Sequence, residues 1–432
     1  MSLVLFLKKF LTKSNFFRNV LVIMFGTVVA QVITVVASPI LTRLFSPSAF
    51  GVFGVYMSLV AIITAFVTLR YDQALMLPKK NEEAASLLWA SLLATAGISS
   101  LFLILCLLFS RQIIVILNLP ELKGRLLLFP ISVFLLGVCT TFNSWCTRQK
   151  QFKRSSISQI VRSVVASGVQ VSTGFTKTGP VGLIGGALLG DFLSSLFLWF
   201  QVKRNDLKII KEAFRWHNIK RLAIQYSNFP LYSSTQNLLN AISQNIPVLL
   251  LAKFFGPIVV GYYALGVRVL QIPMDLILTS LRQVLFQRVS EVYNAEGDTY
   301  TLFKRTTLGL LILTIIPALV IIVYAPFLFS FILGKNWVTA GEYARWLVLW
   351  LAVGFVNPPA ILFAQVYKKQ KFLFFQDLTL LIFRFVVLVI GGLYCSSLVT
   401  VIMYSIVGVI FNLFVILYMW FYIRNRLHVV IE

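Results

Sequence analysis

Long apolar runs separated by short polar segments dominate the chain from residue 19 to residue 423. A helix needs about 20 predominantly apolar residues to cross the hydrocarbon core of a bilayer. Twelve runs meet that requirement, so we predict an all-α polytopic membrane protein with twelve transmembrane helices. The predicted spans are residues 19–41, 50–69, 84–109, 126–146, 157–175, 181–201, 222–251, 259–282, 306–333, 345–367, 373–394 and 398–423.

The composition supports a membrane protein and excludes a soluble enzyme. Charged residues make up only 12% of the 432 residues and 59% are hydrophobic, whereas soluble domains carry about 25% charged residues. The formal charge is nevertheless +24, and the basic residues form short clusters between the apolar runs. With a cytoplasmic N-terminus, 25 basic residues fall in cytoplasmic segments and 8 on the opposite side. This bias predicts that both termini are cytoplasmic, and no nucleic-acid partner is expected.

A basic segment divides the predicted spans into two sets of six. All external loops are expected to be short, and the longest is predicted at residues 110–125. The predicted parts are a cytoplasmic amphipathic segment (1–18), an N-terminal six-helix bundle (19–201), a basic cytoplasmic linker (202–221), a C-terminal six-helix bundle (222–423) and a cytoplasmic tail (424–432).

The two halves share sequence features. Residues 41–51 match residues 251–261 at a constant offset of 210, and the matched pairs are Leu41 with Leu251, Arg43 with Lys253, Phe45 with Phe255, Pro47 with Pro257 and Gly51 with Gly261. A weaker match relates residues 148–152 to residues 368–372 at an offset of 220. Six spans per copy give both copies the same orientation. We therefore predict two pseudo-symmetric bundles around a central cavity that holds the substrate.

Polar side chains inside the spans avoid lipid by facing other helices or water. We expect Arg268 and Arg384 to line a polar cavity, whereas Asp275 has the alternative of pairing with Arg268 or Arg282. The full set of candidate substrate-binding residues is Arg268, Arg282, Arg384, Arg162, Gln31, Asn237, Asn240, Gln244 and Gln271. The candidate coupling carboxylates are Asp191, Asp275 and Asp377.

These residues indicate what the cavity binds. Guanidinium groups in a medium of low dielectric constant grip phosphate or pyrophosphate bidentately, so the expected cargo is anionic, amphiphilic and bulky. The four cysteines and two histidines show no metal-ligand spacing, and no nucleotide-binding motif is present. We therefore expect no cofactor, no metal and no enzymatic activity.

Two segments near the N-terminus resemble a known family. Residues 41–56 (LTRLFSPSAFGVFGVY) and residues 70–84 (RYDQALMLPKKNEEA) are similar to the N-terminal signature of bacterial O-antigen and capsule repeat-unit flippases. These proteins form the polysaccharide transporter branch of the multidrug/oligosaccharidyl-lipid/polysaccharide (MOP) exporter superfamily. The resemblance implies a multi-pass protein of the bacterial inner membrane that moves an undecaprenyl-pyrophosphate-linked oligosaccharide to the periplasmic leaflet by alternating access. It also implies membrane lipids, a polysaccharide polymerase and chain-length proteins as partners.

Two other functions remain open at this stage. A cation-coupled drug or metabolite exporter of the same fold would have a cavity dominated by acidic residues, whereas arginines and amides prevail here. A membrane-embedded polysaccharide polymerase would need a large external loop with catalytic Arg or His, and the sequence offers neither. The sequence does not define the sugar composition, the coupling ion or the oligomeric state.

Overall fold

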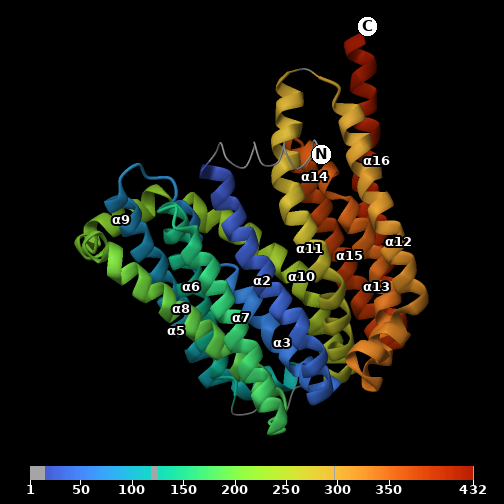
Figure 1. Cartoon of the computed structure of the whole chain (residues 1–432), viewed down its shortest axis with the longest axis horizontal. Coiled ribbons are helices and arrows are strands. Elements are labelled where there is room, and N and C mark those ends of the chain that lie inside the picture. Colours follow the sequence, from blue (N-terminus) through green and yellow to red (C-terminus); the bar gives the residue numbers. More distant parts are fainter. Residues whose placement is uncertain (1–14, 118–124, 296, 432) are drawn as a thin grey trace, which may run out of the picture. The chain divides into compact units, whose positions relative to one another are not determined.

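The computed structural model describes residues 15–117, 125–295 and 297–431, and every regular element in these ranges is a helix (Figure 1). The predicted segment 1–18 lies mostly outside the described residues. With the labels of Figure 1, the elements are α2 (Asn15–Leu44), α3 (Pro47–Thr64), α4 (Tyr71–Ala74), α5 (Asn81–Leu117), α6 (Leu128–Arg148), α7 (Phe152–Phe175), α8 (Pro180–Glu212), α9 (Trp216–Gln225), η2 (Phe229–Ser233), α10 (Ser234–Phe255), α11 (Pro257–Asn294), α12 (Thr299–Leu333), η3 (Lys335–Trp337), α13 (Val338–Val356), α14 (Pro358–Val366), α15 (Gln370–Tyr394) and α16 (Ser397–Ile431).

The all-α membrane architecture predicted from the sequence is confirmed. Within the described ranges, 11 helical segments are long and apolar enough to cross a bilayer, so the count of twelve remains a prediction. The difference is α7, which coincides with the predicted fifth span. It has 24 residues but is too polar to qualify, because it carries Gln159, Arg162, Gln170 and a series of serines.

The connection after the predicted third span begins later than the sequence suggested. The prediction placed it at residues 110–125, but α5 continues to Leu117, with one non-helical residue at Phe109. Residues 118–124 lie outside the described part. The polar residues 110–112 are followed by the apolar run 113–117, and no Gly or Pro occurs between Phe109 and Leu117, so the sequence lacks the signal that would end the helix there.

The chain divides into two compact units. The first holds the residues up to Phe45 together with Val52–Asn245, and the second holds Ser46–Gly51 together with Ile246–Glu432. In the first unit, α7 packs along both α2 and α8. In the second unit, α13 packs against α11, α12 and α16. Of these two helices, α13 is largely enclosed by its neighbours, whereas α7 is packed on two sides and keeps most of its residues partly exposed.

Glycines allow α8 to lie unusually close to α7. Gly182, Gly186 and Gly190 recur every fourth residue, so they share one face of α8. A Cβ at Gly186 would lie 2.5 Å from the side chain of Gln170, and one at Gly190 would lie 2.8 Å from the carbonyl oxygen of Arg162. Small residues at this spacing let transmembrane helices approach each other closely. One face of the polar helix α7 is thereby packed against protein.

The basic segment 202–221 belongs to the first unit and is mostly helical. The helix α8 continues through it to Glu212, and α9 begins at Trp216. Ser86 Oγ donates to the carbonyl of Ala213 at 3.1 Å, and Trp89 Nε1 donates to the carbonyl of Ile210 at 2.9 Å. Both bonds satisfy carbonyls at the end of α8 that have no partner within the helix. The segment is therefore fixed to α5.

Two helix-end turns show the internal repeat in backbone geometry. Lys150 and Lys368 have φ of 56° and 57°, in the left-handed region that closes helix ends. The amide of Gln151 donates to the carbonyl of Cys146 at 2.8 Å, and that of Lys369 donates to Ala364 at 2.7 Å. These bonds join residues five apart in both copies. The turns thus correspond at an offset of 218, while the sequence match suggested 220.

The first turn of α3 packs tightly on the first turn of α11 within the second unit. A Cβ at Gly51 would lie 1.7 Å from the carbonyl oxygen of Pro257, and a Cβ at Gly261 would lie 2.0 Å from that of Pro47. Each glycine thus lies against the proline of the other helix, and the internal repeat matches the two glycines with each other and the two prolines with each other. The two backbones are too close for a side chain at these positions. This explains why a glycine follows the first proline by four residues in both α3 and α11.

The helix α12 begins with a side-chain cap. The carboxylate of Asp298 accepts a hydrogen bond from the amide of Thr301 at 2.9 Å. Such a bond satisfies one of the free amides of the first helical turn. Hydrogen bonds from the side chain and the amide of Thr301 favour the ionised carboxylate, so the pKa of Asp298 is lowered below its usual value.

The glycine contact gives a direct stability prediction. Gly51→Ala and Gly261→Ala should each lower the melting temperature of the purified protein, because an added methyl group has to separate two backbones, and overpacking costs about 1–3 kcal/mol. Gly97→Ala on α5 is the matched control, since no atom lies within 4 Å of its added Cβ. That change should be neutral or stabilising. Equal melting temperatures for all three variants would contradict the role of the contact.

Candidate functional site

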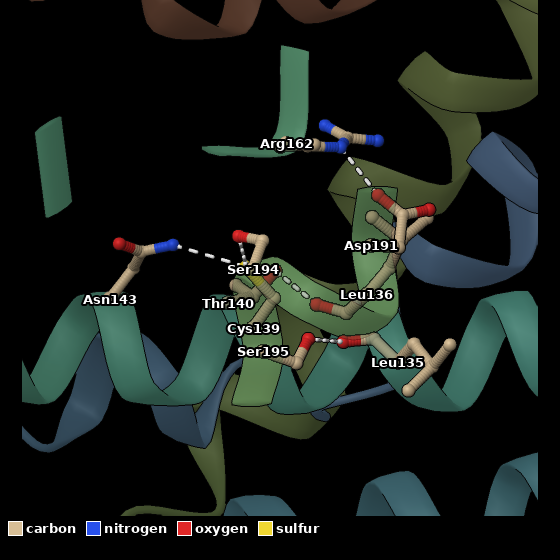
Figure 2. Close-up of polar contacts among 9 residues, drawn as sticks. All are labelled: Leu135, Leu136, Cys139, Thr140, Asn143, Arg162, Asp191, Ser194 and Ser195. Atoms are coloured by element: carbon tan, nitrogen blue, oxygen red, sulfur yellow. Dashed lines mark hydrogen bonds and ion pairs between the residues drawn. The ribbon is translucent and has the colours of Figure 1, made fainter. Parts of the chain in front are cut away.

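A buried ion pair joins α7 to α8 in the first unit (Figure 2). Arg162 Nε donates a hydrogen bond to Asp191 Oδ1. The two side chains differ in burial, because Asp191 is 2% exposed whereas the Arg162 side chain is 42% exposed. A carboxylate buried to this degree needs a counter-charge. The guanidinium supplies it through Nε, while 42% of the Arg162 side chain stays exposed.

Neighbouring polar side chains fix the part of α8 that carries Asp191 (Figure 2). Ser195 Oγ donates to the carbonyl of Leu135 on α6 at 3.0 Å. The Ser194 hydroxyl lies 3.6 Å from the sulfur of Cys139, to which Asn143 also donates at 3.4 Å. These contacts follow Asp191 by one helical turn, so they set the rotation of α8 that directs the carboxylate toward α7.

The helix α2, which carries Gln31, lies along α7. Gly26 contacts Ser156 and Gly174 contacts Leu44, and both pairs are separated by 130 positions. The two helices therefore run parallel in a constant register, which places Gln31 at the level of residue 161. One turn earlier, Thr27 Oγ1 donates to Gln159 Oε1 at 2.9 Å. The structure thus brings the predicted residues Gln31, Arg162 and Asp191 to one level of the first unit.

Gln31 and Gln159 add hydrogen-bonding capacity beside the ion pair. The Oε1 atom of Gln31 is buried and has no hydrogen-bond partner. Gln159 lies three positions before Arg162, which puts both side chains on the same face of α7. Gln159 was not among the predicted residues, although its position three residues before Arg162 was a usable signal.

In the second unit, Arg384 on α15 lies between aromatic rings. Its Cζ atom is 5.2 Å from the ring centre of Trp350 on α13 and 4.9 Å from that of Tyr404 on α16. Arg384 is only 7% exposed. Its Nε atom is buried without a hydrogen-bond partner. Attraction between the charge and the ring faces holds this guanidinium in place.

The remaining predicted residues lie on α10, α11 and α15. The amides of α10 bond along their own helix, with Asn237 Nδ2 donating to the carbonyl of Ser233 at 2.6 Å and Gln244 Nε2 donating to Asn240 Oδ1 at 3.4 Å. Arg268 and Gln271 are half-buried on α11, while Asp275 and Arg282 on that helix and Asp377 on α15 are exposed.

Charge attraction relates some of these residues. Asp275 interacts electrostatically with Arg282, which is one of the pairings left open by the sequence. Asp377 interacts in the same way with Arg384, but no ion pair within 4 Å joins them. Among the residues that the structure describes, no group of three or more His, Cys, Asp or Glu side chains is placed to hold a metal ion.

Known structures share this fold. The lipid II flippase MurJ in an inward closed conformation is similar to the chain with a TM-score of 0.73 and 16% identity, over 95% of this chain and 92% of that one. An inward-facing multidrug resistance MATE family transporter of the MOP superfamily gives a TM-score of 0.68 and 15% identity, over 92% and 95%. A MOP superfamily transporter from Pyrococcus furiosus, with a binding pocket described as having reverse polarity, gives 0.54 and 15%, over 95% of both chains.

The sequence comparisons identify the family. No curated protein is a significant sequence match. A family model described as "Polysaccharide biosynthesis protein" matches residues 40–342, which is more than half of the chain. The chain therefore belongs to this polysaccharide biosynthesis protein family and has the fold of the MOP superfamily transporters.

Proposed function

We propose that this protein is a flippase for an undecaprenyl-pyrophosphate-linked oligosaccharide, the repeat unit of an O-antigen, a capsule or an exopolysaccharide. It moves this lipid-linked glycan from the cytoplasmic to the periplasmic leaflet of the inner membrane by alternating access. Membership of a polysaccharide biosynthesis family carries the proposal. The shared fold with a protein named as a lipid II flippase supports it.

The chemistry of the first unit fits an anionic cargo. Asp191 binds the Nε edge of Arg162, so the two terminal nitrogens of the half-exposed guanidinium remain available for phosphate oxygens. In this role Asp191 positions Arg162, while sequence analysis listed it as a candidate coupling carboxylate. Gln31 and Gln159, at the same level of α2 and α7, offer amide groups to sugar hydroxyls. The half-buried Arg268 and Gln271 on α11 are further candidates for such contacts.

A cation-coupled drug or metabolite exporter is the second candidate, and the MATE family likeness favours it. An exporter of cationic drugs needs accessible acidic groups. Asp191 is 2% exposed and engaged by Arg162. Asp275 and Asp377 are exposed and would have to act as the coupling carboxylates.

Deletion of the gene distinguishes these functions. For a flippase, undecaprenyl-linked repeat units should accumulate on the cytoplasmic leaflet and surface polysaccharide should disappear. Extraction of lipid-linked glycans from spheroplasts, with and without an added impermeant glycan-modifying reagent, reports the leaflet. Single repeat units on the outer leaflet would instead indicate a polymerase. Normal polysaccharide with increased drug sensitivity would indicate the exporter.

Variants of the ion pair test the role of Arg162. Arg162→Met leaves Asp191 buried without its partner, which costs near the lower end of about 3–5 kcal/mol because the arginine is 42% exposed and solvent screens it. The double variant Arg162→Met/Asp191→Asn removes this penalty. It should recover the melting temperature but not the surface polysaccharide. The amount of surface polysaccharide should fall at least tenfold, because the charge-assisted hydrogen bond from Arg162 to the cargo contributes about 1.5–3 kcal/mol.

Arg288→Met is the matched control for the ion-pair variants. Arg288 pairs with Glu291 at an exposed position, with 64% and 51% of the side chains accessible, so its loss should change neither stability nor polysaccharide display. Surface polysaccharide is quantified by immunoblot against membrane levels of each variant. Full display by the double variant would show that Arg162 does not contact the cargo.

A further inference from the structure

The guanidinium of Arg384 is a buried charge without a counter-ion. It is 7% exposed, and in the part of the chain that the structure describes no carboxylate lies within 4 Å of it. Asp377 precedes it by seven positions on α15, which corresponds to about 10 Å along the helix axis, and Asp377 is exposed. The carboxylate of Asp377 therefore attracts Arg384 only at long range and accepts no hydrogen bond from its guanidinium.

The aromatic rings around Arg384 offset its charge but do not satisfy its N–H groups. Trp350 and Tyr404 contact the guanidinium through their ring faces, which attract a cation without offering the lone pairs of an oxygen or an anion. Two donors in these touching side chains remain without partners, namely Nε of Arg384 and the indole Nε1 of Trp350. Buried donors of this kind need an acceptor.

The surroundings limit the size of that acceptor. A Cβ at Gly408 on α16 would lie 2.9 Å from Cβ of Trp350 and 3.6 Å from Nη2 of Arg384. Tyr404 closes another side, and its ring contacts that of Tyr263 on α11 at 6.2 Å. With Arg384 7% exposed, this space does not admit a pyrophosphate with its glycan. A single small ion is the acceptor that fits the chemistry.

We propose that Arg384 and the indole N–H of Trp350 bind a small monovalent anion of the halide class, with chloride as the physiological member, inside the second unit. The anion accepts hydrogen bonds from both orphaned donors and neutralises the guanidinium. This site is separate from the Arg162 site and does not depend on which cargo the protein moves. A failure of the flippase proposal therefore leaves it intact, and the reverse also holds.

Thermal unfolding of the purified full-length protein tests the site. The protein is titrated with sodium chloride against sodium gluconate at constant ionic strength and pH, and then with sodium bromide. The wild-type protein should show a saturable rise in melting temperature with either halide. Arg384→Gln should lose this rise, while Arg288→Gln, which removes an exposed arginine, should keep it.

Trp350→Phe separates an anion site from a merely structural arginine. This variant keeps a ring face against Arg384 but removes the indole N–H, so half-maximal stabilisation should require about fivefold more chloride, as expected for one hydrogen bond. If Arg384→Gln does not fold, Trp350→Phe still tests the anion site. Anomalous scattering from bromide-soaked crystals should give a peak beside Arg384. A melting temperature of the wild-type protein that responds equally to chloride and gluconate, or an unchanged halide response in Trp350→Phe and Arg384→Gln, would overturn the proposal.

Discussion

The bilayer imposes the constraint on which this structure depends: a polar group inside it must find its partner within the protein. Helix α7 shows the consequence most clearly. It is long enough to cross a membrane but too polar to face lipid, and it packs along α2 and α8. Side chains of α2 and α8 therefore supply partners to some polar groups of α7, and the polar groups that they leave exposed are available for a ligand.

Small residues make that enclosure possible. The glycines of α8 bring its backbone within reach of α7, and Gly190 lies against the carbonyl of Arg162 immediately before Asp191. A larger residue there would move the carboxylate away from the guanidinium. The same device operates in the second unit, where Gly51 and Gly261 pack reciprocally on Pro257 and Pro47. Glycine spacing in this protein thus determines electrostatic contacts as well as packing.

Patterns within one helix or one turn were predictable from the sequence. The spans follow from hydrophobicity, and the matching of Pro47 and Gly51 to Pro257 and Gly261 identified residues that the structure places in contact. The pairing of Arg162 with Asp191 was not predictable, because it depends on the rotation of two helices about their axes. The repeat offset at Lys150 and Lys368 was also missed, since sequence similarity aligned side chains while the backbone turn lies two positions away.

Two arginines that look alike in the sequence differ because of their surroundings. Arg162 binds a buried carboxylate through Nε and keeps 42% of its side chain exposed, which fits the proposed contact with a large phosphate ester. Arg384 has ring faces around it and almost no accessible surface, so a pyrophosphate-linked glycan finds no surface on it to bind. Both lie inside predicted spans, and an insertion scale assigns an arginine the same cost in either. Burial and the chemistry of the neighbouring side chains, rather than the charge itself, therefore decide what each arginine is able to bind.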